Sequence, residues 1–239
     1  MDATKIVRLY LDGRLGRGEL QCLRGAVNKL LRDACGSYEG NVFFHNHEGS
    51  GLRYGYPLVQ FRRSATGAVI VGIADAADSV HSLAERQDLR LKIGRRDMVL
   101  SVDRCEEIFY TPKVADEPKL YSLSNYIALT EENLTEYNGL LALSDKTILL
   151  ESILVGNILS FFKGIGYHAD EQLAAVLTDI DSTGETVYKG IKWKTFNLHF
   201  VSNVELPDGI GLGKSVSVGY GTLRREKLDD ELIKKFANG

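Results

Sequence analysis

Hydrophobic and polar positions in the first part of the chain follow the periods of strands and helices. Apolar residues alternate with polar ones over residues 6–11, the period of a half-buried strand, and recur at helical spacing over residues 18–35. The following segments predict a hairpin with Gly67 at its turn, a second helix and two more strands: 54–61, 67–73, 74–87, 88–94 and 97–102. The order β-α-β-β-α-β is that of the ferredoxin-like unit.

The rest of the chain repeats this pattern less regularly. Two prolines and an acidic pair interrupt any period over residues 110–120, which predicts a boundary. Beyond it the sequence predicts a strand at 121–129, a helix that starts after Thr130 and a long apolar helix at 146–164. A strand at 173–180 and a hairpin at 187–206 follow. We therefore expect an α+β protein of two ferredoxin-like (βαββαβ) halves in tandem, with domains at 1–110 and 120–239 and a linker at 111–119.

Composition fits a packed protein in a reducing cytosol. Hydrophobic residues make up 44% of the chain and charged residues 26%, enough for real cores. The most apolar run, 148–162, is short and interrupted by Glu151, so we expect no membrane span. The three cysteines form no CxxC pair, which favours free thiols and argues against structural zinc. A cytoplasmic location is the expectation.

The net charge of −3 argues against a generic nucleic-acid binder. The charge is nevertheless uneven, because basic groups exceed acidic ones in residues 1–70 and acidic groups exceed basic ones in residues 101–150. A locally positive face can hold a polyanion. A solvated surface with chance asymmetry explains the same distribution.

The glycine-rich stretch 206–223 resembles part of a nucleotide-binding loop. Gly213, Lys214 and Ser215 supply the second half of the P-loop pattern, but Asp208 stands where its first glycine is needed. The alternation and glycines of residues 216–221 predict a strand and a turn rather than the required helix. ATP binding is therefore disfavoured.

A second dense stretch holds two histidines. His45 and His47 bracket Asn46, and on a strand their side chains would share a face and could ligate a metal. The nearest carboxylate is Glu48, and there is no nearby cysteine to complete such a set. A structural histidine pair that hydrogen-bonds a loop is the other interpretation of the residues alone.

Three segments together resemble a known family. They are FHNHEGSGLRYGYPLVQF followed by GAVIVGI, then LVGNILSFFKGIGY, then GIGLGKSVSVGYGTL. In this order they are similar to the CRISPR-associated repeat-RNA-processing endoribonucleases of the RAMP superfamily, from about residue 20 to residue 223. The resemblance implies two ferredoxin-like folds, CRISPR repeat RNA as partner, and cleavage without a metal or other cofactor.

The resemblance also implies the catalytic residues. In such relatives the second histidine of the H-N-H run and the tyrosine seven residues later are implicated, here His47 and Tyr54. Histidine titrates near neutral pH and can act as general base or acid, whereas a tyrosine with a pKa near 10 suits orienting the nucleophile or stabilising the phosphate. Relatives often use a lysine of the first helix, which favours Lys29. His45 is expected to contact the catalytic residues without touching the RNA, or to have a purely structural role.

Further residues are expected to bind RNA. Arg53 and Arg32 are the other candidate cations for the scissile phosphate, and the spacing does not choose between them and the lysine of the first helix. The glycine-rich loop would bring main-chain N–H groups close to phosphates, with a charge-assisted contact from a lysine and a neutral one from a serine, through residues Gly211, Gly213, Lys214, Ser215, Gly219 and Gly221. A tight turn that serves packing alone is the alternative.

The implied function leaves several partners open. Val218 stands where a polar or basic residue is expected in the loop, which weakens the predicted phosphate contact there. Other CRISPR effector subunits are candidate partners, and helix 146–164 is apolar enough to support a homodimer. A non-catalytic RNA-binding subunit of the same superfamily is the alternative to an endoribonuclease.

Overall fold

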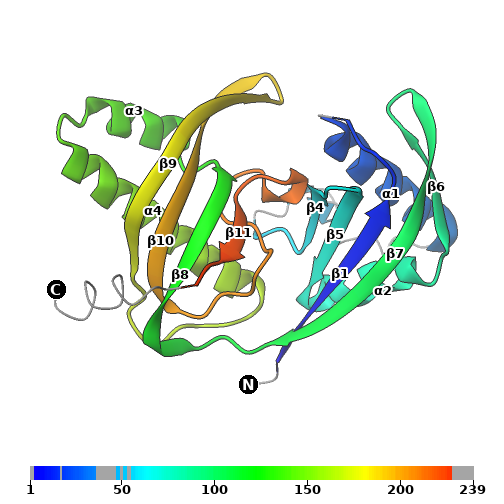
Figure 1. Cartoon of the computed structure of the whole chain (residues 1–239), viewed down its shortest axis with the longest axis horizontal. Coiled ribbons are helices and arrows are strands. Elements are labelled where there is room, and N and C mark those ends of the chain that lie inside the picture. The colour runs from blue at the N-terminus through cyan, green and yellow to red at the C-terminus, as the bar shows by residue number, and fades with distance from the viewer. Residues whose placement is uncertain (1–2, 17, 36–46, 49–50, 53–54, 228–239) are drawn as a thin grey trace. The chain divides into compact units, whose positions relative to one another are not determined.

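The structure is a computed structural model that describes residues 3–16, 18–35, 47–48, 51–52 and 55–227 (Figure 1). The chain divides into two compact units. The first unit is Met1–Thr111 with Val216–Gly219, and the second is Pro112–Ser215 with Tyr220–Gly239. Each unit is an antiparallel sheet with helices packed on it, so the expected α+β class is confirmed.

The first unit is built around a five-stranded sheet in the order β4-β5-β1-β7-β6. The strands are β1 (Thr4–Asp12), β4 (Val59–Arg63), β5 (Gly67–Ile73), β6 (Asp88–Ile93) and β7 (Arg96–Tyr110). The central strand β1 contributes Ile6, Leu9 and Leu11 to the core, all at most 1% exposed. The predicted strands of this half are therefore present, and β7 and β6 extend the ferredoxin-like order beyond β1.

Two helices cover this sheet. Helix α1 (Glu19–Cys35) packs on β6 and β4, and α2 (Ala77–Ala84), which follows the 3₁₀ turn η2 (Ala74–Ala76), packs on β1 and β5. Their apolar positions at helical spacing, including Leu23, Val27, Val80 and Leu83, are fully buried. The short strands β2 (His47–Glu48) and β3 (Gly51–Leu52) form a separate ladder.

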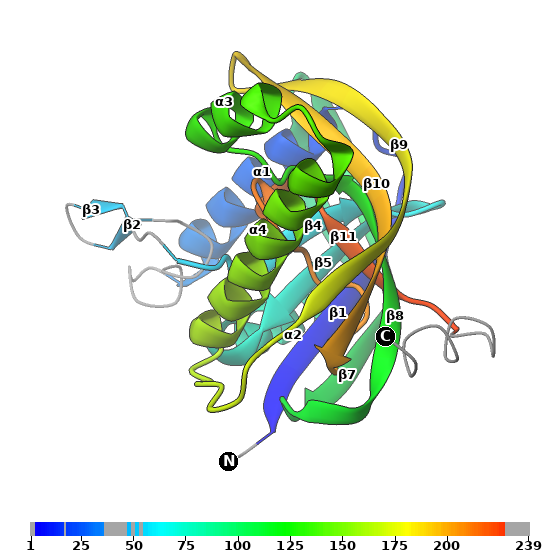
Figure 2. The ribbon, with the colours of Figure 1, turned by 90° about the vertical axis from the view of Figure 1, so that its left-hand side faces the viewer.

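The second unit has a four-stranded sheet in the order β11-β8-β10-β9. Its strands are β8 (Val114–Tyr126), β9 (Ala175–Tyr188), β10 (Ile191–Val204) and β11 (Thr222–Arg225). Helices α3 (Glu131–Gly139) and α4 (Leu143–Gly164) both lie between β8 and β9 in the chain (Figure 2). The predicted helix start at Thr130 is confirmed, because its side chain accepts a hydrogen bond from the Asn133 N–H.

The expected linker 111–119 is largely part of a strand. Strand β8 begins at Val114, and its ladder with β10 shifts register between the pairs Lys119–Ser202 and Val114–Val204. Pro118 lies within this irregular stretch, between the paired positions Val114 and Lys119, which is where a proline is tolerated in a strand. The two prolines therefore mark an irregular strand rather than a structureless connection.

By length and composition, one helix in the described part of the chain could cross a membrane. It is α4, whose most apolar window has a mean hydropathy of 1.4. Five of its side chains, Leu150, Leu154, Ile158, Phe161 and Phe162, are at most 1% exposed, and the helix lies against β9. These contacts are those of a helix that covers a sheet.

Candidate functional site

The predicted catalytic segment is described only in part. His47 begins strand β2 and pairs with Leu52 of β3, and Glu48 pairs with Gly51. His45, Arg53 and Tyr54 lie outside the described residues, as do the side chains of His47 and Arg32. The roles assigned to these residues therefore remain predictions.

The structure describes residues before and after the predicted catalytic segment, and the candidate cation Lys29 is among them. Lys29 is exposed on α1, two residues after the buried Val27 and six residues after the buried Leu23. It is thus available as a cation for a bound phosphate. Over the described residues, no three His, Cys, Asp or Glu side chains group as metal ligands.

A buried polar cluster joins the Y-P-L-V-Q segment, residues 56–60, to Arg62 on strand β4. Gln60 is 0% exposed and donates to the Tyr56 hydroxyl (2.8 Å) and to the Pro57 carbonyl (3.1 Å). Arg62 is 7% exposed and donates through Nη2 to Gln60 Oε1. Burying a guanidinium is costly unless hydrogen bonds compensate it, so this cluster marks β4 as a polar, organised strand beside the predicted catalytic segment.

The tip of the glycine-rich loop belongs to the first unit, although the sequence places the whole loop in domain 120–239. Residues Val216–Val218 form a 3₁₀ turn, η3, so the strand predicted there is wrong. Arg24 of α1 donates through Nη1 to Ser217 Oγ at 3.0 Å. Val218 is 6% exposed, so packing explains the apolar residue at this position.

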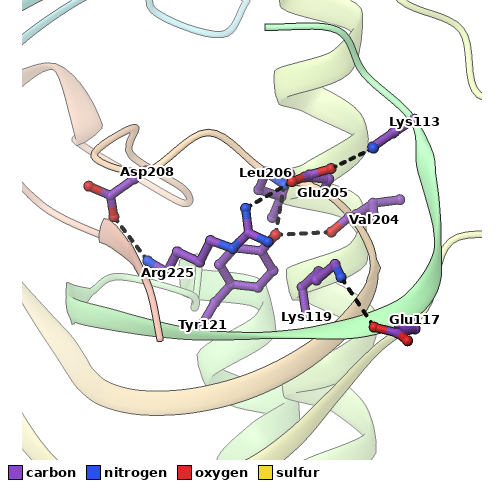
Figure 3. A network of polar contacts seen from close by, with 9 residues as sticks. All are labelled: Lys113, Glu117, Lys119, Tyr121, Val204, Glu205, Leu206, Asp208 and Arg225. Atoms are coloured by element: carbon purple, nitrogen blue, oxygen red, sulfur yellow. Dashed lines mark hydrogen bonds and ion pairs between the residues drawn. The ribbon is translucent and has the colours of Figure 1, made fainter. Parts of the chain in front are cut away.

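The base of the loop is tied to the second unit through Asp208 (Figure 3). Asp208 Oδ1 accepts from the Arg225 N–H at 2.9 Å, and its other oxygen lies 3.4 Å from Arg224 Nη1. A glycine, which the P-loop pattern requires here, could make neither contact. Asp208 therefore anchors the loop to β11.

A second anchor lies beside it in the same view (Figure 3). The buried Tyr121 hydroxyl donates to the Val204 carbonyl (3.2 Å) and accepts from the Leu206 N–H (2.8 Å), and burial raises the pKa of Tyr121. Glu205 pairs with Lys113 (3.0 Å) and Arg225 (2.8 Å). The hydrogen bond from Lys113, followed by that from Arg225, lowers the pKa of Glu205. The loop thus leaves the sheet from a rigid base.

Three glycines of the loop have packing roles. Gly213 has φ +92°, and a Cβ there would lie 2.5 Å from Tyr126 Cε2. Gly221 has φ +61°, and its Cβ would lie 1.8 Å from the Leu212 carbonyl oxygen. At Gly219, with φ +91°, the Cβ would lie 3.0 Å from Leu20 Cδ1. The packing interpretation of the loop therefore accounts for all three positions.

The main chain of the loop is bonded within the protein. The N–H groups of Lys214, Gly219 and Gly221 donate to the carbonyls of Ile127, Val216 and Asn125, and Gly211 forms a bridge with Thr222. These three donors are therefore not free for phosphates, so the expected main-chain contacts with RNA do not come from these three N–H groups.

The side chain of Lys214 lies over an aromatic ring. Its Nζ is 5.3 Å from the ring centroid of Trp193, a half-buried residue of β10. Lys214 itself is exposed, and Ser215, next to it, has φ +58°. Sequence reasoning missed Trp193, because nothing in the local pattern links it to a lysine in a distant loop.

Models of two protein domains match the chain, the Cas6b N-terminal domain over residues 3–108 and the Cas6b C-terminal domain over residues 113–226. The chain belongs to the Cas6b family. A curated relative, the uncharacterised protein MJ0978 of Methanocaldococcus jannaschii, is 41% identical over 103 residues, which cover 43% of this chain and 69% of that protein.

Solved structures support the Cas6b fold. A crystal structure of Cas6b is 23% identical, with a TM-score of 0.78, and the match covers 95% of this chain and 100% of that one. The structure of a CRISPR RNA processing endoribonuclease, Cas6b, is 21% identical with a TM-score of 0.68 over the same shares of the two chains. The predicted fold, two ferredoxin-like units in tandem with the second less regular, is confirmed.

Proposed function

We propose that this Cas6b protein is an endoribonuclease that cleaves CRISPR repeat transcripts into guide RNAs. The observation that carries the proposal is the match to both Cas6b domain models over nearly the whole chain. The likeness in fold to a CRISPR RNA processing endoribonuclease agrees with it. The H-N-H and Y-P-L-V-Q segments add the residue types that such a reaction needs.

The proposed reaction is a transesterification within the RNA. The ribose 2′-oxygen attacks the adjacent phosphorus while the bond from phosphorus to the 5′-oxygen breaks, which leaves a 2′,3′-cyclic phosphate and a 5′-hydroxyl. A base takes the proton of the 2′-hydroxyl, and an acid protonates the departing 5′-oxygen. No metal takes part in these steps.

In this proposal His47 moves the proton and Tyr54 positions the reacting groups. Histidine changes its charge near neutral pH and so can serve as either base or acid. A tyrosine keeps its proton at that pH and can donate a hydrogen bond to a phosphate oxygen. Lys29, with Arg53 and Arg32 as alternatives, neutralises charge that builds up on the phosphate.

The glycine-rich loop contributes to binding chiefly through Lys214. Its ammonium is exposed and stands at the surface of the second unit. Ser215 can add a neutral hydrogen bond beside it. The glycines of the loop hold these two residues in place. They allow close packing where a side chain would clash, and they let the main chain form its internal hydrogen bonds.

Replacing His47 tests the proposed chemistry. His47→Ala should slow the cleavage of labelled repeat RNA by about 10²–10⁴-fold, the usual contribution of a general acid or base, without weakening RNA binding. His45→Ala is the matched control, because it removes the neighbouring histidine and should leave most of the activity. Cleavage at the wild-type rate in His47→Ala would contradict the assignment.

A modified substrate provides a second test. RNA with a single 2′-deoxy nucleotide at the cleaved position should bind the wild-type protein normally and resist cleavage, because the nucleophile is missing. Cleavage of this RNA would rule out attack by the 2′-oxygen. Tight binding of unmodified repeat RNA without any cut would identify a non-catalytic RNA-binding subunit instead.

A further inference from the structure

The outer part of the β9–β10 hairpin gathers three aromatic rings on one face, and we propose that they form a stacking platform for unpaired bases of the RNA. The aromatic platform consists of Tyr188, Trp193 and Tyr220, with Lys189 and Lys214 beside it. All five residues belong to the second unit. The proposal rests on the proposed function, since it names a further RNA-binding surface of the same protein.

The strand register puts the platform on one face. In the β9–β10 ladder Trp193 pairs with Thr186 and Ile191 pairs with Tyr188. Because side chains alternate between the two faces of a strand, these four residues share one face. The face is therefore set by the pairing of the hairpin.

Tyr220 joins the platform from the glycine-rich loop. Its hydroxyl lies 2.8 Å from Thr186 Oγ1, and its ring centroid lies 6.0 Å from that of Tyr188. The rings of Tyr188, Trp193 and Tyr220 belong to half-buried residues, so each keeps part of its surface in water. Partly exposed aromatic rings held in fixed positions are suited to stacking on flat partners.

Positive charge accompanies the rings. Lys214 Nζ lies 5.3 Å from the Trp193 centroid, and Lys189 Nζ lies 5.6 Å from the Tyr188 centroid. Neither lysine forms an ion pair with a carboxylate in the part of the chain that the structure describes, whereas Lys192 pairs with Glu185 at 2.6 Å. The charge of Lys189 and Lys214 thus stays available to a polyanion.

This combination is the chemistry that recognises single-stranded nucleic acid. Proteins that bind single strands stack bases on aromatic side chains and follow the backbone phosphates with cations. Trp193, with Lys214 beside its ring, can offer such a stacking surface and such a cation together. The ligand that fits is an unpaired stretch of RNA, with a base on the ring and a phosphate near a lysine.

The fluorescence of Trp193 tests the platform directly, because it is the only tryptophan of the chain. Wild-type protein is titrated with CRISPR repeat RNA and, separately, with a short oligouridylate, while binding is followed by the anisotropy of a labelled RNA. Quenching that saturates together with binding supports the platform. Binding of repeat RNA with unchanged Trp193 fluorescence would overturn it.

Substitutions give an independent measure. Trp193→Leu should weaken RNA binding roughly 5- to 150-fold, the usual effect of losing one stacked base, and Trp193→Phe should keep most of the affinity. Tyr188→Leu should also weaken binding, and it keeps the test open if the Trp193 variants lose their circular dichroism spectrum. Unchanged affinity in folded Trp193→Leu or Tyr188→Leu protein would contradict the proposal.

A matched control and a cleavage assay separate this proposal from the proposed function. Phe109→Leu removes an aromatic residue that is 67% exposed on β7 of the first unit, and it should leave the affinity unchanged. Quenching and binding without any cleavage would uphold the platform and refute the endoribonuclease. Cleavage at the wild-type rate by Trp193→Leu, with unchanged affinity, would refute the platform alone.

Discussion

Replacing Gly213 with alanine should destabilise the second unit by about 2–5 kcal/mol. An L-residue in the left-handed region costs about 1–2 kcal/mol, and Gly213 has φ +92°. The new Cβ would lie 2.5 Å from Tyr126 Cε2 and 2.7 Å from the Ile127 carbonyl oxygen. Tyr126 is 0% exposed and its hydroxyl accepts from Asn157 at 2.6 Å, so the ring cannot move away freely. Overpacking of this kind adds about 1–3 kcal/mol.

Chemical denaturation followed by the fluorescence of Trp193 measures this cost in the second unit. Gly190→Ala is the matched control, because Gly190 has φ +78° but no atom within 4 Å of the new Cβ. It should cost only the conformational part, about 1–2 kcal/mol. Equal losses of unfolding free energy in the two variants would refute the argument that Gly213 is required by packing.

Three further outcomes follow from the described residues. Lys214→Ala should weaken RNA binding and reduce the slope of log affinity against log salt by about 0.7–1, the effect of one phosphate contact. Gly156→Ala should raise the unfolding free energy by about 0.8–1 kcal/mol, because this α4 position is exposed and open. Burial raises the pKa of Tyr126, so the unfolded chain ionises this tyrosine first and stability falls by up to about 1.4 kcal/mol per pH unit as the pH rises above about 10. Tyr126→Phe should reduce this dependence and leave the smaller contribution of the buried Tyr121.

Each outcome has its own control. For Lys214, the comparison is Lys192→Ala, which removes a lysine already paired with Glu185 and should leave the salt slope unchanged. For Gly156, a loss of stability in denaturant melts would contradict an open, exposed position. For Tyr126, denaturant melts at several alkaline pH values compare the wild type with Tyr126→Phe, and parallel pH profiles would show that this buried hydroxyl does not set the alkaline limit.

Helices and strands whose apolar residues recur at regular spacing could be predicted from the sequence, and elements shaped by contacts with distant residues could not. Helices α1 and α4 and strand β1 bury one regular face, so their apolar spacing predicts them. The expected linker 111–119 contains the boundary between the two units, after Thr111, but overlaps β8 from Val114 onward. Its prolines suggested a longer connection because proline is normally excluded from central strands, whereas Pro118 occupies an irregular part of β8. The strand predicted at 216–218 failed because Val216 and Val218 are buried by tertiary packing as a 3₁₀ turn.

The site shows the same division. His47, Tyr54 and Lys214 were singled out through the resemblance to a known family, which is carried by local motifs. The buried Arg62 had a weak signal, a charged residue in the otherwise buried run VQFR, that sequence reasoning did not use. No sequence signal pointed to Trp193, because Thr186 in the ladder and Lys214 in the loop become its neighbours only when the chain folds.

Incubation of the protein with labelled CRISPR repeat RNA in excess EDTA tests the central claim most directly. The proposed function predicts a single cut within the repeat, with a 2′,3′-cyclic phosphate on one product and a 5′-hydroxyl on the other. Loss of cleavage in EDTA, or products that carry a 5′-phosphate and a 3′-hydroxyl, would contradict metal-free attack by the 2′-oxygen.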